Sequence, residues 1–240
     1  MKADRLTTAV RHQLGLGRLL PLGGLRDGAW IAESAAEAVL RRAVREVRGV
    51  RLGPLRLALA DPEGAEEPVV PPPPSALPPG PLRVTAACAA TASEPLPAAA
   101  SRLRTALATA AAERLGLVVA EVDLRVTALL DEEFAEEPEQ VRPPQWSEAA
   151  REGDEARAAD AALAVPGVAG LTDVLGRAVR VEERPHAVAT AAALPRRHVR
   201  VEIAVSADHR ALDVAREVRG VVAEALRDQP TVAVLVTAVG

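Results

Sequence analysis

The sequence predicts an α+β fold made of two tandem copies of a small helix–strand–strand–helix–strand unit. Three observations support this prediction: strand-like alternation, helical stripes of apolar residues, and the recurrence of both in the same order along 240 residues. In each unit, two helices are expected to pack on one face of a three-stranded sheet. The length suits one large domain or two small ones.

The most regular alternation lies in residues 198–206, HVRVEIAVS. Valine and isoleucine occupy every second position, which places them together on one face of a strand that we expect to be buried. A helix follows, because apolar residues then recur at spacings of three and four: Leu212, Ala215, Val218, Val222 and Leu226. Asp208 is expected to cap this helix, and Pro230 follows its end. The last segment, TVAVLVTAV, is apolar on both faces and is therefore expected at the centre of a sheet.

The first half of the chain shows the same order of patterns. Leu82, Val84 and Ala86 alternate with polar residues as in a strand. The next apolar stripe predicts a helix that ends near Gly116 and contains Leu96, Leu103, Leu107 and Ala111. The segment EVDLRVTAL then predicts a strand with one apolar face, and it shares the tripeptide Val-Thr-Ala with the last strand of the chain.

Each half also opens in a similar way. Trp30 and Trp146 lie 116 residues apart, and each begins a segment that runs through a predicted helix to a Val-x-Gly-Val turn, at 47–50 and at 165–168. The apolar stripe of the first of these helices consists of Ile31, Ala35, Val39, Ala43 and Val47. The second helix is expected over 147–164. After each turn comes a further strand, with Leu55, Leu57 and Leu59 or with Val179 and Val181.

These patterns divide the chain into four parts: an N-terminal segment 1–27, a first unit 28–130 with a Pro-rich loop insertion 61–81, an acidic linker 131–145, and a second unit 146–240. The segment GRLLPLGGLRDGAW could add a strand or a hairpin to the first unit. The linker contains Phe134, the only phenylalanine, which we expect to dock on one of the units rather than to anchor a partner.

Composition and charge exclude several classes of protein. The chain is 49% hydrophobic and 26% charged, with a net charge of −4, which is typical of a globular protein and argues against broad capture of polyanions. One cysteine excludes an internal disulfide. Aromatic residues make up only 1%, as expected of a bacterial genome rich in GC codons. Because no signal peptide or long apolar stretch is present, we expect a cytoplasmic protein that does not insert into the membrane itself.

No residue is assigned a catalytic, cofactor-binding or metal-binding role, and no cofactor is expected. The histidines, His12, His186, His198 and His209, lack the spacing of a metal site. Ser206, Asp208 and His209 are close in sequence, but closeness in sequence is not the geometry of a catalytic triad. Cys88 lies in an alanine-rich strand without a basic neighbour, which indicates a small buried residue rather than a reactive thiol.

Other motifs are equally weak. Gly15, Gly17, Gly23 and Gly24 do not match a phosphate-binding loop. The carboxylate pairs Glu132–Glu133 and Glu182–Glu183 do not form an acid–base pair. The G-x-x-G at 167–170 lacks the basic residues and flanking helices of an RNA-binding KH loop. A local basic patch lacks aromatic residues that would stack on bases, and it consists of Arg196, Arg197, His198 and Arg200.

The second unit resembles a known family. The heptapeptide VPGVAGL, at 165–171, resembles the turn of the alkaline-shock, or envelope stress response, family, and the following strand, helix and last strand keep that family's order. The first unit is similar in its Ile31-Ala32 opening and its turn at 47–50, although the family usually has one unit per chain. A second departure is the helix over 147–164, which contains Gly153 and many charges. The whole chain is also similar to tandem-duplicated actinobacterial proteins, some labelled nucleopolyhedrovirus-type, a label to which we give no functional weight.

This resemblance implies a non-enzymatic, abundant cytoplasmic protein that is linked to cell-envelope stress and tethered to the membrane through a partner. A duplicated unit without converging polar side chains likewise favours a scaffold or interaction protein, which can form a pseudo-symmetric pair within one chain. We expect protein partners, among them a membrane-anchored envelope protein, as well as self-association, and no nucleic acid. Two alternatives stay open: a small-ligand-binding protein or enzyme with an unrecognised site, and an RNA-binding module.

Overall fold

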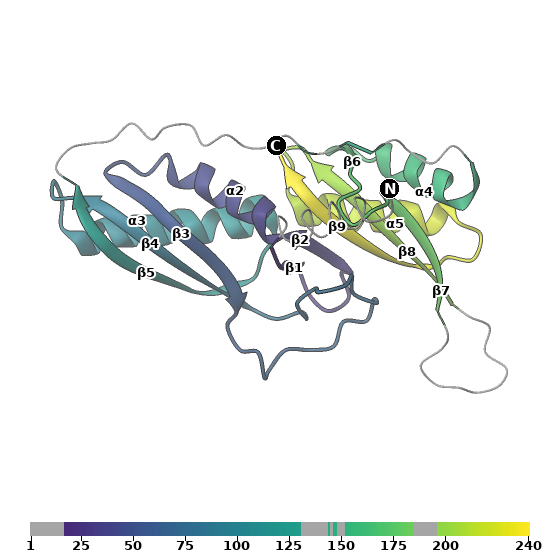
Figure 1. Ribbon diagram of the computed structural model, residues 1–240, viewed down its shortest axis with the longest axis horizontal. Helices are drawn as coiled ribbons and strands as arrows, with labels where there is room; N and C mark the ends of the chain where they lie inside the picture. Colours follow the sequence, from purple (N-terminus) through teal and green to yellow (C-terminus); the bar gives the residue numbers. More distant parts are fainter. Residues whose placement is uncertain (1–16, 131–143, 145, 148–151, 185–195) are drawn as a thin grey trace, which may run out of the picture.

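The computed structural model describes residues 17–130, 144, 146–147, 152–184 and 196–240. Within these residues the chain is mixed α+β, as predicted, with four α-helices and two sheets of three and six strands. The two sheets lie side by side along the longest axis of the molecule, and the helices of both halves lie on the same side of them (Figure 1).

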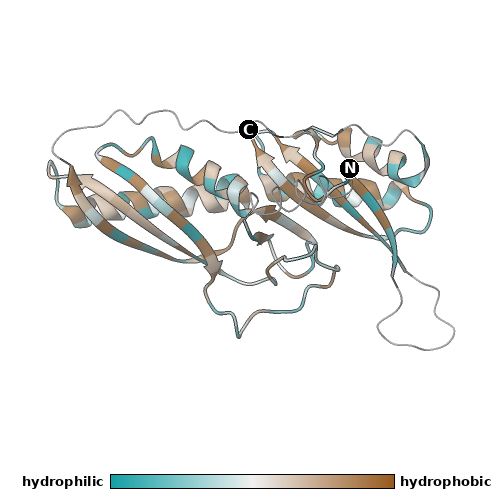
Figure 2. Cartoon of the chain, in the orientation of Figure 1, coloured by the Kyte–Doolittle hydropathy of each residue, from teal (hydrophilic) through white to brown (hydrophobic). Residues whose placement is uncertain are grey.

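The three-stranded sheet comes from the first half of the chain. β3 (Val50–Leu59) pairs antiparallel with β4 (Leu82–Thr91), and β4 pairs parallel with β5 (Val119–Leu130). Hydrophobic and hydrophilic residues alternate along β3 (Figure 2), so that one face of the sheet is apolar. Leu57 and its neighbour Val84 are completely buried on this face.

Two helices cover the apolar face of this sheet. α2 (Glu33–Val44) precedes β3, and α3 (Leu96–Thr109) continues as a π-helical segment, η1 (Ala110–Leu115), before β5. Leu40 of α2 and Leu107 of α3 are both completely buried. The predicted end near Gly116 is confirmed: this residue has a φ of 85°, a left-handed conformation that ends helices and that glycine adopts without strain.

The six-stranded sheet draws its strands from both ends of the chain: β1 (Leu19–Leu22), β2 (Ala29–Ala32), β6 (Val168–Leu171), β7 (Val179–Arg184), β8 (Arg196–Val205) and β9 (Thr231–Val239). β9 lies between β2 and β8 and runs parallel to both. β6 and β7 pair antiparallel with β8, one after the other. The predicted central position of the last strand is confirmed, and nearly all of β9 is buried.

The helices of the second half are α4 (Gly153–Leu163) and α5 (Ala211–Ala225). Val201 and Ile203 of β8 are fully buried, as their alternation predicts, and so is Val218 of α5. In both halves a first strand pairs antiparallel with a second, and the second pairs parallel with a third; in the second half the first strand is split into β6 and β7. The tandem duplication itself stays a prediction.

The prediction of a second three-stranded sheet is wrong, because this sheet also contains the β1–β2 hairpin. The segment before α2 does form a hairpin, but β2 pairs with β9 and not with the sheet of the first unit. Ile31 therefore belongs to a strand, and the helix that we predicted to start near Trp30 starts at Glu33. Consecutive apolar residues suit a buried parallel strand as well as the start of an apolar helix, so the sequence did not distinguish the two.

Two further predictions of local structure are corrected. Asp208 does not cap α5, since the N-cap residue is Arg210 and makes no side-chain hydrogen bond of this kind. Asp208 accepts hydrogen bonds from Ser206 and His209 instead. The helix expected over 147–164 begins at Gly153 within the described residues.

The Pro-rich segment lies between β3 and β4, as predicted, but it packs against the six-stranded sheet. The amide of Leu77 donates to the carbonyl of Leu19 at 2.8 Å, and the Trp30 indole donates to the carbonyl of Leu77 at 3.2 Å. Val70 from the same segment is 3% exposed. An insertion in the first half therefore covers a strand that belongs to the second sheet.

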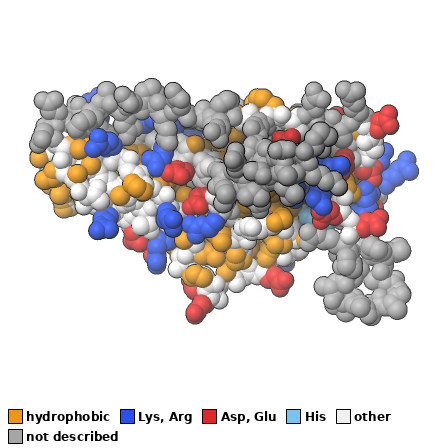
Figure 3. All heavy atoms as spheres, viewed as in Figure 1, with side chains coloured by type: hydrophobic (Ala, Val, Ile, Leu, Met, Phe, Trp, Pro, Cys, Tyr) orange, Lys and Arg blue, Asp and Glu red, His pale blue; other side chains and the backbone are white. Residues whose placement is uncertain are grey.

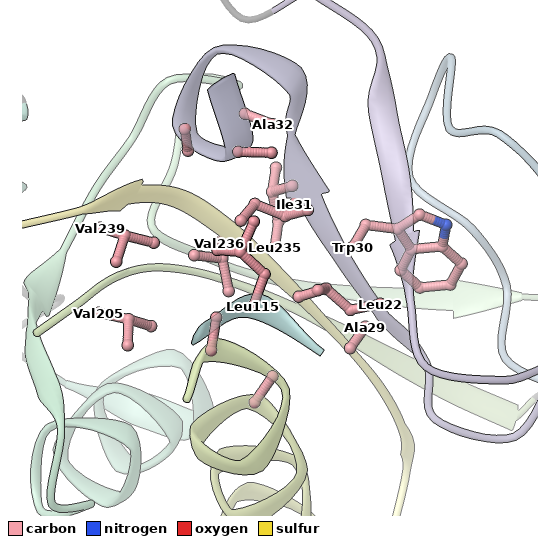
Figure 4. Packing of buried hydrophobic residues seen from close by; sticks show 14 of the residues in the cluster. Leu22, Ala29, Trp30, Ile31, Ala32, Leu115, Val205, Leu235, Val236 and Val239 are labelled. Atoms are coloured by element: carbon pink, nitrogen blue, oxygen red, sulfur yellow. The ribbon is translucent and has the colours of Figure 1, made fainter. Parts of the chain in front are cut away.

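The junction between the two halves is a continuous hydrophobic core. Leu115, at the end of η1, is fully buried and lies in the same cluster as Val205 and Val236 of the six-stranded sheet (Figure 4). Outside the core, Asp27 of the hairpin turn accepts two hydrogen bonds from the Arg216 guanidinium of α5, at 2.8 and 3.0 Å. The two halves are therefore joined by apolar packing and by this ion pair between the hairpin and α5.

Glu33 connects both sheets at the start of α2. Its carboxylate accepts hydrogen bonds from the Arg18 guanidinium next to β1 and from the amide of Leu57 in β3. Burial raises the pKa of this carboxyl group, but the hydrogen bonds from Arg18 and Leu57 outweigh it, so that the pKa lies below its ordinary value of 4.5. Because the pKa is lowered in the folded state, the ionised carboxylate stabilises the fold above the ordinary pKa of 4.5. This contribution is lost as the pH falls below that value.

We therefore expect Glu33→Gln to lower the free energy of unfolding at pH 7 by about 1–3 kcal/mol, because hydrogen bonds between charged groups are lost. The measurement is urea denaturation at several pH values. The difference between variant and wild type should shrink as the pH falls below the ordinary pKa of 4.5. A difference that stays constant on acidification would contradict this role for the carboxylate.

Candidate functional site

A groove runs between α2 and α3 on the side of the helices that faces away from the sheet. Small side chains line it: Ala43 on α2, and Ser101, Thr105, Ala106 and Thr109 on α3. At one end it reaches Ala110 of η1 and the residues Ala207 and Val239 of the other half. Because alanine, serine and threonine do not fill the space between two helix surfaces, the groove stays open and has a volume of about 700 Å³.

Charged side chains border this groove: Arg42, Glu46, Arg102, Glu113 and Arg114. Arg102 pairs with Glu94 and also donates to the carbonyl of Arg48 at 3.1 Å. α2, α3 and η1 together contain five Arg and three Glu. This helical surface is therefore basic in a chain whose net charge is −4. By contrast, α4 and α5 together contain six acidic residues and three Arg.

A second feature is a buried ion pair on the six-stranded sheet. Glu202 of β8 is completely buried, and its carboxylate lies 3.3 Å from the Arg200 guanidinium. The loop between β6 and β7 covers it, since the amide of Leu175 donates to the other carboxylate oxygen at 3.1 Å. Burial raises the pKa of Glu202 to about 7, although the hydrogen bond from Leu175 and the charge of Arg200 oppose this.

Ser206, Asp208 and His209 do come together, but not as a catalytic triad. Asp208 accepts from Ser206 Oγ and lies 2.9 Å from Nδ1 of His209, so the carboxylate is the central group. In a triad the histidine is central, because it must take the proton from the serine. The hydrogen bonds from Ser206 and His209 lower the pKa of Asp208. The cluster closes the turn before α5, where His209 also packs against Gly167.

The remaining histidines and the cysteine are found in structural surroundings or outside the described residues. His198 is buried near the start of β8, with Nδ1 2.9 Å from the Thr231 hydroxyl, whereas His209 lies beyond the other end of the strand. Cys88 is buried in β4, and burial raises the pKa of its thiol although Arg104 opposes this. Among the described residues, no group of three or more His, Cys, Asp or Glu side chains could hold a metal ion. His12, His186 and Phe134 lie outside these residues.

The basic patch and the glycine motifs have other partners. Arg197 pairs with Asp154 and Asp228, so its charge is neutralised by neighbouring carboxylates. The G-x-x-G at 167–170 lies in β6 except for Gly167, which directly precedes the strand. The side chain of Arg196 lies outside the described residues. Gly24 belongs to the hairpin turn beside Gly23, and its amide donates to Asp27 at 2.7 Å. Gly17 precedes β1, whereas Gly15 lies outside the described residues.

The carboxylate pairs are separated as well. Glu182 lies in β7 and pairs with Arg180 at 2.6 Å, while Glu183 next to it is exposed. Successive residues of a strand point to opposite faces, so the two carboxylates do not converge. Glu132–Glu133 lie outside the described residues.

Neither the groove nor the buried ion pair was singled out from the sequence. The signal for the groove was present in the small residues that recur at four-residue spacing on α3, Ser101, Thr105 and Thr109. Such residues are common on exposed helix faces, so the spacing acquires meaning only when a second helix lies alongside. In the alternation of residues 198–206, Glu202 lies on the face opposite to the valines and isoleucine, and only the covering loop makes it a buried charge.

Comparisons with known proteins add no family assignment. A scan against models of protein families finds no match to this chain, and a search of the curated proteins finds no relative. The resemblance to the alkaline-shock family therefore stays a prediction. In the part of the chain that the structure describes, no helix is long and apolar enough to cross a membrane.

Proposed function

We propose that this protein is a non-enzymatic interaction scaffold and that the groove between α2 and α3 binds an acidic amphipathic helix of a partner protein. The observation that carries the proposal is the combination of small side chains in the groove with a basic surrounding surface. Small residues let a third helix approach the other two closely, and arginine side chains at the border would pair with its carboxylates. Binding of an amphipathic helix in an apolar groove is a common mode of protein recognition.

The proposed partner is a membrane-anchored envelope protein that contributes a segment outside the membrane. The resemblance of VPGVAGL and the elements after it to the alkaline-shock family supports this part of the proposal. Tethering through such a partner would give the protein a membrane-associated location without a spanning segment of its own. The link to envelope stress rests on the same resemblance.

We also propose that the two halves arose by tandem duplication. The support is the equivalent order of helices and strands and the equal direction of strand pairing in both halves. On this hypothesis the charge difference between the two helical surfaces reflects divergence of the copies. The basic copy would keep the role of binding an acidic partner.

One observation favours a second candidate function. A volume of about 700 Å³ lies within the range of pockets that bind small molecules. A small-ligand-binding protein would be stabilised by one or a few metabolites in a thermal-shift screen, whereas an interaction scaffold would respond to a peptide. An RNA-binding role has less support, because Arg197 and Arg200 of the basic patch are paired with carboxylates.

The proposal is tested with two labelled helical peptides that share one apolar stripe, flanked by glutamate in the first and by lysine in the second. Fluorescence anisotropy with the full chain should detect binding of the glutamate peptide alone, and salt should weaken it. Ala106→Trp, which fills the groove, should abolish binding. Arg42→Glu combined with Arg114→Glu should weaken it by about tenfold.

The matched control is Arg56→Glu on β3, an exposed charge reversal on the sheet rather than in the groove. This variant should bind like the wild type, and circular dichroism should show that all variants are folded. Equal binding of both peptides, binding of neither, or unchanged binding by Ala106→Trp would overturn the proposal.

A further inference from the structure

β5 is an edge strand whose outer side pairs with no other strand in the part of the chain that the structure describes. It is twelve residues long, contains no proline, and has charged side chains at only three positions, Glu121, Asp123 and Arg125. Two large apolar side chains on it are exposed, Val126 at 38% and Leu129 at 60%. Hydrophobic side chains gather at the end of the molecule where β5 and α3 lie (Figure 3). Such an edge favours pairing with a further strand.

The six-stranded sheet shows how an equivalent edge is covered. β9 follows a helix and runs parallel to its neighbour β8, as β5 does to β4, but its outer side pairs with β2. As a result β9 is almost fully buried, whereas most residues of β5 are exposed. Within the described residues, β5 therefore lacks the additional strand that β9 has.

The side chains of β5 favour a second copy of the same strand as the partner. If two copies pair antiparallel with Leu124 at the two-fold axis, Val122 of each lies opposite Val126 of the other, and Asp123 lies opposite Arg125. Val122 is opposite Val84 in the register of the sheet, so these apolar residues lie on the face that the helices cover. The pairing would therefore join two apolar rows and form two ion pairs at once.

Neighbouring registers are worse, because they bring like charges together. An axis at Val122 would place Glu121 opposite Asp123, and an axis at Asp123 would place this carboxylate opposite its own copy. An axis at Arg125 would oppose two guanidinium groups. The sequence of β5 thus selects one antiparallel register among those that involve its central residues.

One backbone carbonyl group of β5 is bonded to a side chain of α3. The carbonyl of Val122 accepts a hydrogen bond from the Arg104 guanidinium of α3 at 3.3 Å. This backbone acceptor on β5 is therefore already bonded to a side chain. A second strand would replace Arg104 with a backbone amide. The pairing of β4 with β5 shifts register between Cys88 and Ala89, next to the position where Cys88 lies opposite Val126. We therefore expect regular pairing of a second strand with β5 to end near Val126.

We propose that two copies of this chain dimerise through β5 and thereby join two three-stranded sheets into one continuous six-stranded sheet. This inference is independent of the groove between α2 and α3. It also assigns a role to the exposed Val126 and to the opposite charges of Asp123 and Arg125, which follow one another on the same face of the strand.

Sedimentation-velocity ultracentrifugation of the full chain over a range of concentrations tests the proposal. The wild type should form a reversible dimer. Asp123→Arg and Arg125→Asp should each weaken the dimer by about tenfold, since either one places like charges opposite each other twice. The double variant Asp123→Arg with Arg125→Asp should restore the affinity, and Arg104→Ala should strengthen it.

Arg56→Asp is the control, since it reverses an exposed charge on β3, at the opposite edge of this sheet from β5. Its dimer should be as stable as that of the wild type. A wild type that is monomeric at every concentration would overturn the proposal. A dimer that responds equally to the single and the double charge variants would overturn it as well, because the interface would then lie elsewhere.

Discussion

Trp30→Ala is expected to lower the free energy of unfolding by about 3–5 kcal/mol, the range found when large aromatic residues are removed from a packed core. Trp30 is 1% exposed, and its indole donates to the carbonyl of Leu77 at 3.2 Å. The ring lies on the side of β2 opposite to Ile31 (Figure 4), where the Pro-rich segment covers the sheet. The variant would lose both the packing and the hydrogen bond that attaches this segment. Urea denaturation followed by circular dichroism measures the change.

Trp146→Ala is the matched control, because the sequence suggested equivalent positions for the two tryptophans. Trp146 is 57% exposed and lies against Gly170 at the edge of β6. Its removal should cost less than about 1 kcal/mol. As the chain has two tryptophans and no tyrosine, each variant keeps one emitter, and Trp30 alone should fluoresce at shorter wavelength than Trp146 alone. Equal costs or equal emission maxima would contradict these placements.

The second large effect concerns pH. We expect the free energy of unfolding to decrease by about 3 kcal/mol as the pH rises from about 5 to about 8, because the carboxyl group of Glu202 titrates in this range. Burial raises its pKa from 4.5 to about 7, so over this interval the folded state retains a proton that the unfolded state has released. The contribution of a raised carboxyl pKa is fully present below 4.5 and is lost as the pH rises through 7. Denaturation with urea over this pH range tests the prediction.

Glu202→Gln separates this contribution from those of other titrating groups. Glutamine still accepts a hydrogen bond from the amide of Leu175 but cannot ionise, so the slope assigned to Glu202 should disappear. Arg200 and Asp173 face the same carboxylate and remain in place, as does the buried His198. The exposed Glu224→Gln is the control and should keep the wild-type slope. A Glu202→Gln variant with an unchanged slope would refute the assignment.

Much of the local structure could be predicted because it depends on periodicity within a single segment. The alternation in β8 and the apolar stripe of α5 led to elements at the expected places, with Val201, Ile203 and Val218 fully buried. The apolar character of β9 predicted its central position. In each of these cases the same residues form the element and provide the surface that buries it.

The two candidate surfaces could not be predicted from one segment at a time. The groove requires that α2 lie beside α3 at a distance that Ala106 and Thr105 do not fill. β5 can be recognised as an edge strand only when the order of strands in the sheet is known. No described strand pairs with its outer side, whereas β2 pairs with the outer side of β9. Both depend on which elements become neighbours, and periodicity contains no information about neighbours.

The amino-acid sequence alone determined the α+β class, the order of most helices and strands, and the buried faces of β8 and α5, since these follow from the spacing of apolar side chains. Only the tertiary structure decided that β2 joins β9, that the Pro-rich segment covers Trp30, and that Glu202 lies under a loop. The physical reason is the range of the interactions. Apolar periodicity acts over a few residues, whereas strand partners and burial are chosen by contacts between segments far apart in the chain.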